Sequence, residues 1–370
     1  MKEGWEYKKL GEVATLYDSQ RKPVTKKDRK NGIYPYYGAS GIQEYVDNYI
    51  FDGRYLLVGE DGAKWGANDK TAFIVEGKIW VNNHAHIMTF DDSVKDRFVE
   101  YYLVGKDLNE YITGAVVPKL TQASLSKIPI PIPPLVEQER IVAELDLLSS
   151  IIEKKKAQLK ELDQLAQSIF YDMFGDPITN EKGWEVKKLG EVCRAIGDGL
   201  HGTPQYDANG TIAFINGNNL IDGKITITPK TLYVNNSEAQ KIHIELDTNT
   251  ILLSINGTLG KTAVYNNEKV VLGKSACYCK LTNKLNVDFV LSLMNTNTFK
   301  CFLESNSSKS TIKNVGLKAI RNYKVILPPL PLQQEFASKI EAIERQKSLI
   351  QQSIVETQTL FDSRMDHWFG

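Results

Sequence analysis

The same ten-residue phrase occurs twice in the chain, and this repeat constrains the fold more than any other feature of the sequence. Residues 4–13 read GWEYKKLGEV and residues 183–192 read GWEVKKLGEV, 179 positions later. The copies differ only at Tyr7 and Val186. Composition bias does not place Trp, Gly, Lys and Glu at the same offsets twice. The chain therefore contains an internal duplication.

A second pair of matching segments follows the two copies at a larger and constant offset of 195. Residues 130–145 read IPIPPLVEQERIVAEL and residues 325–340 read VILPPLPLQQEFASKI, which pairs Gln138 with Gln333. The match runs without a gap to the Phe-Gly pairs at 174–175 and 369–370, so about 16 extra residues lie earlier in the second unit. Each unit is predicted to be a variable domain followed by a segment of constant length, with boundaries at 1–133, 134–175, 176–328 and 329–370.

Each constant segment is predicted to form one long helix. From about residue 136 to 173 there is neither Pro nor Gly, and apolar residues recur every three or four positions in two heptad series. In the first segment these positions are Leu145, Ile152, Leu159, Ala166 and Met173 with Ile141, Leu148, Lys155, Leu162 and Ile169, and in the second they are Ile340, Lys347, Ile354, Phe361 and Trp368 with Phe336, Ile343, Ile350, Thr357 and Arg364. The pattern predicts two coiled-coil helices, each a rod of about 55 Å at roughly 37 residues.

Two features of these helices depart from a simple apolar seam. Polar residues interrupt the heptads at Lys155, Lys347, Thr357 and Arg364. Further apolar residues lie outside the heptads, namely Val142, Leu147, Ile151, Leu165, Leu349, Val355 and Leu360. Two helices alone cannot cover these side chains, so either partner helices or the chain's own domains must cover them.

Length and composition indicate a globular protein of two or three domains, because 370 residues with 42% hydrophobic content exceed one compact core. No apolar run approaches a membrane span and the polar start is not that of a signal peptide, so we expect a cytoplasmic protein with no membrane partner. The four cysteines have no zinc or redox spacing, which predicts reduced and mostly buried thiols.

The formal net charge is zero, yet the charge is unevenly distributed. Residues 21–30 carry six basic side chains and one Asp. Such a run is either a solvated face or a surface that binds a polyanion.

The variable domains are predicted to be mixed α/β globules, because short β-rich runs alternate with turn signals and helical runs are brief. Their loops, such as YPYYGASG, NNHAH and DGLHGTPQY, are rich in Asn, Gly, Tyr, His and Lys. These side chains can bind base edges and phosphates.

The sequence contains no complete catalytic motif. INGTLGKT ends like a phosphate loop, but Ile255 occupies the position where that motif requires Gly. His84 and His86 have no acidic or cysteine partner at a telling spacing, so we expect no metal site. There is no Asn/Asp-Pro-Pro-aromatic run for base methylation and no dinucleotide-binding glycine fingerprint.

The duplicated W-x-x-K-x-L-G-E-V openings, the PPL and Gln starts of both long helices and the phrases YPYYGASG and DGLHGTPQY resemble the specificity subunit of type I restriction-modification systems over the whole chain. The resemblance implies two target-recognition domains of similar fold, each reading one half of a split double-stranded DNA site, separated by two antiparallel helices. It implies a non-catalytic subunit that binds two methyltransferase subunits, which modify an adenine in each half-site, and a restriction subunit with translocase and nuclease activity. S-adenosylmethionine, ATP and Mg would then be bound by those partners, with no cofactor in this chain.

Geometry also favours antiparallel helices. A duplex has local twofold axes perpendicular to its length, so a duplicated reader of two half-sites shares such an axis, and its helices run in opposite directions. Two other functions stay open: a stand-alone enzyme of nucleic-acid metabolism, and a coiled-coil adaptor that binds only protein.

We predict that polar and basic loop residues contact DNA. For the first half-site they are Lys26, Lys27, Tyr37, Lys64, Asn83, His84 and Lys119. For the second half-site they are His201, Thr203, Gln205, Tyr206, Asn218, Lys261, Lys309 and Lys313.

Overall fold

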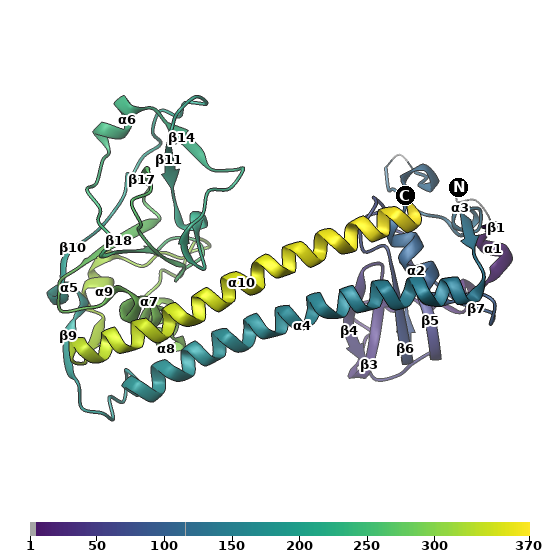
Figure 1. Ribbon diagram of the computed structural model, residues 1–370, viewed down its shortest axis with the longest axis horizontal. Coiled ribbons are helices and arrows are strands. Elements are labelled where there is room, and N and C mark those ends of the chain that lie inside the picture. The colour runs from purple at the N-terminus through teal and green to yellow at the C-terminus, as the bar shows by residue number, and fades with distance from the viewer. Residues whose placement is uncertain (1–4, 115) are drawn as a thin grey trace. The chain divides into compact units, whose positions relative to one another are not determined.

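The computed structural model describes residues 5–114 and 116–370, and the chain divides into two compact units (Figure 1). Unit 1 contains the residues up to Lys156 together with Gln351–Gly370, and unit 2 contains Ala157–Ile350. Each unit therefore combines one mixed α/β domain with parts of both long helices. The duplication read from the sequence is a duplication of domains.

Unit 1 is built on a six-stranded sheet with the order β2-β7-β5-β6-β3-β4. The strands are β2 (Ala14–Leu16), β3 (Asn31–Gly38), β4 (Gly41–Val46), β5 (Phe51–Gly59), β6 (Ala72–Val81) and β7 (Ala85–Phe90). All neighbours are antiparallel except β3 and β6. Helix α2 (Asp96–Gly105) packs on the sheet through fully buried residues such as Phe98 and Leu103.

Unit 2 also has a six-stranded sheet, with the order β10-β18-β15-β16-β13-β12. Its first four strands repeat the order of β2, β7, β5 and β6 in unit 1, and it again has one parallel pair, β13 and β16. These strands are β10 (Cys193–Asp198), β12 (Leu220–Ile221), β13 (Gly223–Ile225), β15 (Thr250–Ser254), β16 (Thr262–Val264) and β18 (Ala276–Leu281). A second sheet joins β14 (Leu232–Val234), β11 (Ile212–Ile215) and β17 (Val270–Leu272), near α6 (Asn236–Lys241). Most of the extra length lies before β15, in residues 199–249, against the shorter 17–50 before β5.

The repeated ten-residue phrase forms the same small structure in both units. Strand β1 (Glu6–Lys9) continues into α1 (Leu10–Val13), and β9 (Glu185–Lys188) continues into α5 (Leu189–Val192). The leucine that begins each short helix is fully buried. The glutamate of each LGEV accepts a hydrogen bond from the backbone N–H of the preceding lysine. The repeated leucine and glutamate thus have the same structural task in both units.

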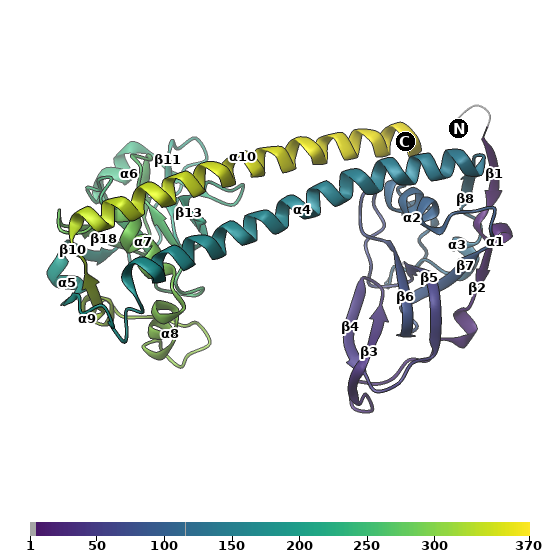
Figure 2. The ribbon, with the colours of Figure 1, turned by 60° about the horizontal axis from the view of Figure 1, so that its bottom comes forward.

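Each opening strand pairs with the strand that precedes the long helix of its own unit. Strand β1 pairs antiparallel with β8 (Pro129–Ile132), after α3 (Gln122–Leu125), and Figure 2 shows both strands near the start of α4. In the same register, β9 pairs with β19 (Lys324–Leu327), after α9 (Leu317–Asn322). Each domain therefore begins and ends on one two-stranded ribbon.

The two predicted helices are present and are each 40 residues long, α4 (Leu135–Phe174) and α10 (Leu330–Phe369). Every heptad residue of both series is buried or half-buried. In unit 1, Glu144 bonds to Arg364 and Lys155 bonds to Thr357. Residue numbers therefore increase along α4 in the direction in which they decrease along α10. In unit 2, Phe170 packs against Phe336. Within each unit the helices are antiparallel, as predicted.

The polar residues that interrupt the heptads bond across the seam. Arg364 holds the Glu144 carboxylate with two nitrogens, one at 3.1 Å, and Lys155 donates to the hydroxyls of Ser353 and Thr357. Lys347 lies 2.8 Å from Asp163. These bonds satisfy charged groups in a half-buried seam and depend on one alignment of the helices.

A buried glutamine fastens the first turn of each long helix to its own domain. Gln138 is fully buried; its Oε1 accepts from the backbone N–H of Lys95 at 2.9 Å, and its Nε2 donates to the carbonyls of Ser93 and Pro133. Gln333 has the same environment in unit 2. Its Oε1 accepts from the N–H of Asn286 at 2.8 Å, at the start of α7 (Val287–Asn295), and its Nε2 donates to the carbonyls of Lys284 and Pro328.

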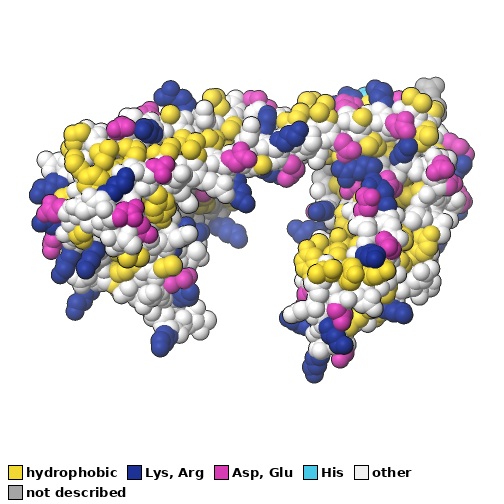
Figure 3. Space-filling model, turned by 90° about the horizontal axis from the view of Figure 1, so that it is seen from below, with side chains coloured by type: hydrophobic (Ala, Val, Ile, Leu, Met, Phe, Trp, Pro, Cys, Tyr) yellow, Lys and Arg dark blue, Asp and Glu magenta, His cyan; other side chains and the backbone are white. Residues whose placement is uncertain are grey.

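Five of the seven apolar residues outside the heptads stay exposed, whereas Val142 and Ile151 are half-buried. Side chains that stay 48–65% exposed are Leu147, Leu165, Leu349, Val355 and Leu360. Hydrophobic side chains are visible at the surface of the long helices in Figure 3. Of the two alternatives left open by the sequence, cover by the chain's own described residues does not hold for these five side chains. Among the described residues, no helix is long and apolar enough to cross a membrane.

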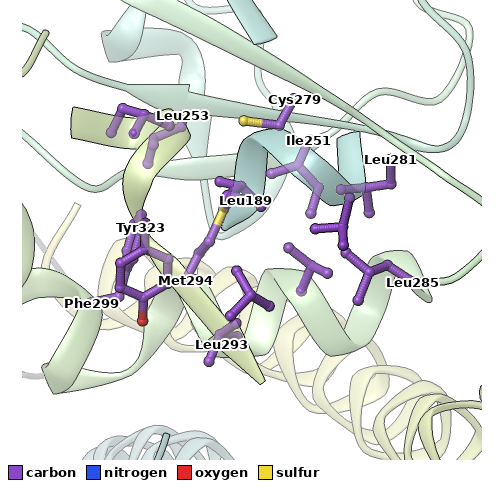
Figure 4. Packing of buried hydrophobic residues seen from close by; sticks show 14 of the residues in the cluster. Leu189, Ile251, Leu253, Cys279, Leu281, Leu285, Leu293, Met294, Phe299 and Tyr323 are labelled. Atoms are coloured by element: carbon purple, nitrogen blue, oxygen red, sulfur yellow. The ribbon is translucent and has the colours of Figure 1, made fainter. Parts of the chain in front are cut away.

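The core of unit 2 joins the domain to the helices. Leu189, Ile251 and Leu293 meet in it, and Phe299 of α8 (Asn297–Ser305) packs on Tyr323 (Figure 4). Cys277 and Cys279 are buried, Cys193 is half-buried and Cys301 is exposed, all as free thiols. The expectation of mostly buried thiols is wrong for Cys301.

Candidate nucleic-acid interface

In unit 1, three loops meet beyond the end of the central strand β5 and carry four of the predicted contacts. The N–H of Glu60 donates to the carbonyl of His84, and the N–H of Leu120 donates to the carbonyl of Glu60, both at 2.8 Å. The His84 ring bonds to the Asp61 carboxylate, and Lys119 Nζ lies 2.7 Å from Glu60. Lys64 and Asn83 are exposed on two of these loops.

A buried charged network lies beneath these loops. Arg21 donates to the Glu60 carboxylate at 2.5 Å and to the carbonyl of Ala85 at 2.7 Å. His86 is fully buried; Nδ1 lies 2.5 Å from Asp18 and Nε2 lies 2.8 Å from the carbonyl of Leu120. Each ring nitrogen therefore faces an oxygen acceptor. Burial opposes ionisation of Asp18, but the hydrogen bond and charge of His86, the charge of Arg21 and the backbone N–H of Ile87 together outweigh burial and lower the pKa of Asp18.

Asp18, Glu60 and His86 are the one group among the described residues whose ligand atoms lie close enough for a metal ion, within 4.8 Å of one another. No sequence signal marked Asp18 and Glu60 as partners of His86. Arg21 bonds to both carboxylates, and Lys119 bonds to Glu60. These cations neutralise the charge that a metal would need, so the group is best explained as a support for the loops.

Tyr37, Lys26 and Lys27 are the other predicted contacts of unit 1, and they lie outside the three loops that meet beyond β5. The carbonyl of Tyr37 accepts from the N–H of Asn82 at 3.1 Å, next to the turn that carries Asn83 and His84. Burial, followed by the nearby Tyr45, raises the pKa of Tyr37, so its hydroxyl stays protonated. Lys26 and Lys27 are exposed.

The basic loop, residues 21–30, is held in place by contacts with strands β3 and β6. The hydroxyl of Tyr36 accepts from the N–H of Val24 at 3.1 Å, and the Arg29 guanidinium lies 4.3 Å from the centre of the Tyr36 ring. The Trp80 indole donates to the carbonyl of Lys22 at 2.7 Å. The loop thus presents its lysines from a held position, a useful property for phosphate contacts.

In unit 2, loops from distant parts of the sequence surround a recess of about 380 Å³. It is lined by Leu200, His201, Gly202, Phe214, Asn216, Asn256, Gly273, Lys274 and Ser275. The N–H of Gly257 donates to the carbonyl of Lys313 at 2.9 Å, which brings the loop of Lys309 and Lys313 to this side. Amide, imidazole and ammonium groups therefore converge, as hydrogen bonding to base edges requires.

The other predicted residues of unit 2 lie around this recess. Asn218 is exposed in the 3-10 turn Gly217–Asn219, and its N–H donates to the side chain of Asn216. Tyr206 packs edge-on against Phe214 at 5.8 Å, and the N–H of Gln205 donates to Glu238. Thr203 is exposed in the same loop. Lys261 follows Gly260 but precedes strand β16, so it lies at no helix N-terminus.

Sequence reasoning missed several polar side chains at these sites. Asn216 and Asn256 line the recess of unit 2 with Lys274. Both asparagines occur in an Ile-Asn-Gly phrase, a turn signal that could have identified them. In unit 1, Gln43 accepts from the Asn82 amide at 3.3 Å. No sequence signal marks Gln43 or Lys274.

Comparison with known proteins finds one matching family model and several relatives of similar sequence. The family model described as type I restriction modification DNA specificity domain matches residues 2–164 and 181–358. A Haemophilus influenzae protein described as a type I restriction enzyme specificity subunit is 28% identical over 355 residues, covering 92% of this chain and 87% of its own. The type I restriction enzyme MjaIX specificity subunit of Methanocaldococcus jannaschii is 25% identical over 291 residues, covering 68% and 63%.

Two solved structures share the fold. The S subunit of a type I restriction-modification system from M. genitalium has a TM-score of 0.60 at 13% identity, covering 98% of this chain and 95% of its own. A chain from a study of assembly and conformational transition of the type I restriction-modification system has a TM-score of 0.57 at 18% identity, covering 100% and 98%.

Proposed function

Because the chain belongs to the type I restriction-modification DNA specificity family and is a specificity subunit, we propose that it binds a bipartite site in double-stranded DNA, each half read by one domain. One observation carries the proposal. Both domains share the order of the first four strands of the sheet and gather polar and basic loops beyond the same central strand, β5 or β15, yet the loops differ. A common scaffold with different loops suits a protein that reads two different half-sites.

The proposed contacts divide by chemistry. Lysines on exposed loops, such as Lys26 and Lys309, bind phosphates, which position the protein without reading sequence. Amide and imidazole groups such as Asn83 and His201 bind base edges in the major groove.

The long helices are the proposed docking sites for two methyltransferase subunits. The exposed apolar residues on α4 and α10 are what a helical partner would cover, and among the described residues no domain covers them. The restriction subunit joins the same assembly. S-adenosylmethionine, ATP and Mg act in the partner subunits, the chain itself is non-catalytic, and the complex works in the cytoplasm.

Reconstitution tests this function. The full chain, a methyltransferase subunit from the same source and S-adenosylmethionine are mixed with genomic DNA, and methylated positions are found by sequencing. We expect one split motif with adenine methylated in each half, and no methyl transfer by the chain alone. Turnover by the chain alone would support a stand-alone enzyme instead, and assembly without DNA binding would support a protein-only adaptor.

Salt dependence tests the phosphate contacts. Changing Lys26 and Lys27 together to Ala should weaken DNA binding and reduce the salt slope of log K by about two, since each lost contact releases about one fewer counterion. Lys160, an exposed lysine on α4, is the matched control. An unchanged slope would exclude the basic loop from the interface.

A further inference from the structure

Both domains present an exposed β-branched aliphatic side chain at the tip of the same loop. Val117 and Ile312 are each 64% exposed. They lie 195 positions apart, the same offset that relates the two long helices. The offset also relates Leu120 to Val315, which are both fully buried at the base of the loops. The tip residue therefore belongs to the constant part of the repeat, unlike the longer loops that differ between the domains.

The loop of unit 1 is held by its own backbone. Thr113 and Lys119 exchange two backbone hydrogen bonds, at 2.9 and 2.8 Å. Gly114 has φ +94°, and a Cβ there would lie 2.3 Å from the carbonyl oxygen of Val117. Only glycine fits this close approach, so the chain is shaped to present Val117 outward.

The loop of unit 2 reaches the same result with different bonds. The N–H of Ser308 donates to the carbonyl of Asn314 at 2.9 Å, and the N–H of Asn314 donates back to the Ser308 hydroxyl at 3.1 Å. The Ser310 hydroxyl donates to the carbonyl of Ile312 at 2.6 Å. Two different sets of bonds that expose one kind of side chain indicate a common task.

The surroundings of both tips are polar and charged. Near the tip of unit 1, Lys119 is paired with Glu60 and Asp61. In unit 1 the loop pairs with the loop after β5 through a bridge between Asp61 and Lys119. In unit 2, Lys309 and Lys313 flank Ile312, and a bridge between Asn256 and Asn314 joins the loop to the wall of the recess. An aliphatic side chain at the tip of a polar loop can contact the apolar faces of DNA bases.

We propose that Val117 and Ile312 are apolar wedges that enter the duplex at the adenine to be methylated in each half-site and favour its extrusion from the base stack. The inference rests on the proposed function and deepens it. A base must leave the stack to be modified, and this event is common to both half-sites although their sequences differ. An aliphatic side chain cannot specify a base by hydrogen bonding, but it can separate a base step and occupy the vacated space.

The test uses the reconstituted complex with duplexes that carry 2-aminopurine at one target adenine, and with unlabelled duplexes for strand-specific methylation rates. Val116, 93% exposed beside Val117, is changed with it to exclude compensation. Val116→Ser with Val117→Ser should lower extrusion fluorescence and methylation roughly tenfold in the first half-site only, and Ile312→Ser should do so in the second only. Val117→Ile and Ile312→Val should retain both signals.

Ile178→Ser is the matched control, because Ile178 is 74% exposed on the segment between α4 and β9, which is not part of either loop. If the parent complex is active and each wedge variant methylates both half-sites at equal rates, the wedge proposal is overturned and the proposed function is not. Loss of complex assembly in the absence of DNA, measured by sedimentation, would overturn it in favour of protein docking. A parent complex that neither binds nor methylates DNA would overturn the proposed function itself.

Discussion

At the scale of single residues, a fully buried amide fixes each long helix to its domain. Gln138 and Gln333 each accept one backbone N–H from the start of a domain helix and donate to two carbonyls. An amide is suited to this place because it offers an acceptor and two donors on one planar group. The repeated Gln was visible in the sequence, but its partners were not.

Removal of this amide should destabilise the fold. Gln333→Ala leaves the N–H of Asn286 and two carbonyls without their buried partner, which should lower the free energy of unfolding by about 1–3 kcal/mol. Urea denaturation measures the change. Gln334→Ala, at the exposed neighbouring position, should have almost no effect. Equal effects of the two variants would contradict the role of the buried amide.

The pair Asp18 and His86 should make stability depend on pH. Because the pKa of Asp18 is lower in the folded chain than its ordinary value of about 3.9, its carboxylate stabilises the fold fully above that value. The contribution is lost as the pH falls through the lower folded pKa. The groups that face Asp18 are His86 and Arg21, with Glu60 and Lys119 behind them.

The measurement compares urea midpoints of the parent and Asp18→Asn between about pH 7 and pH 3. We expect the parent to be more stable at neutral pH, with a difference that is constant down to about pH 5 and shrinks below about pH 4. A difference that stays constant or grows in acid would show that ionised Asp18 does not stabilise the fold.

At the scale of elements, the long helices were the most predictable part of the fold and the sheets the least. The period of apolar residues and the absence of Pro and Gly predicted α4 and α10 to within one residue at each described end. Strand order could not be predicted, because pairing such as β10 with β18 joins segments about 80 residues apart and leaves no local signal. The polar network of Arg21, Glu60 and His86 was missed for the same reason.

The charged pair in the seam between the helices should contribute measurably. Glu144 and Arg364 form a two-nitrogen contact in a half-buried place, and the Trp368 indole also donates to Glu144 at 3.2 Å. The hydrogen bond from Arg364 lowers the pKa of Glu144, so the carboxylate stays ionised at neutral pH. A double-mutant cycle to Ala should give a coupling energy of about 0.5–1 kcal/mol.

The matched control is the pair Glu341 and Arg345, which lies one helical turn apart on α10 with both side chains 75% exposed. Its coupling energy should be close to zero, since an exposed pair is screened by water. Similar coupling energies in the two cycles would mean that the cross-helix contact adds nothing beyond an ordinary surface pair.

At the scale of the whole molecule, equal helices follow domains of unequal length. The match from Pro133 to Gly175 against Pro328 to Gly370 has no gap, although the second domain is the longer one. The domains tolerate added loops because the shared strands carry the core, whereas the helices must stay matched to keep their cross-contacts aligned. The bases read by each domain could not be predicted, since they depend on loop positions that no sequence pattern encodes.

If the helices set the gap between half-sites, lengthening them should widen it. Insertion of about four residues in each helix adds roughly 5.4 Å, which corresponds to one to two base pairs at about 3.4 Å each. The insert must keep the apolar seam, because four residues shift the heptad by half a repeat. Methylome sequencing of parent and variant gives the gap. An unchanged gap, or changed bases within a half-site, would show that the helices are not a spacer.

The two-stranded ribbons have a consequence for how such proteins change over generations. Each domain enters through β1 or β9 and leaves through β8 or β19, and these strands pair with each other in one register beside the start of a long helix. Everything between them can be exchanged as a single cassette without altering the joints. The opening strands β1 and β9 read EYKK and EVKK, so a domain moved into the other unit would meet a nearly identical joint at its entry.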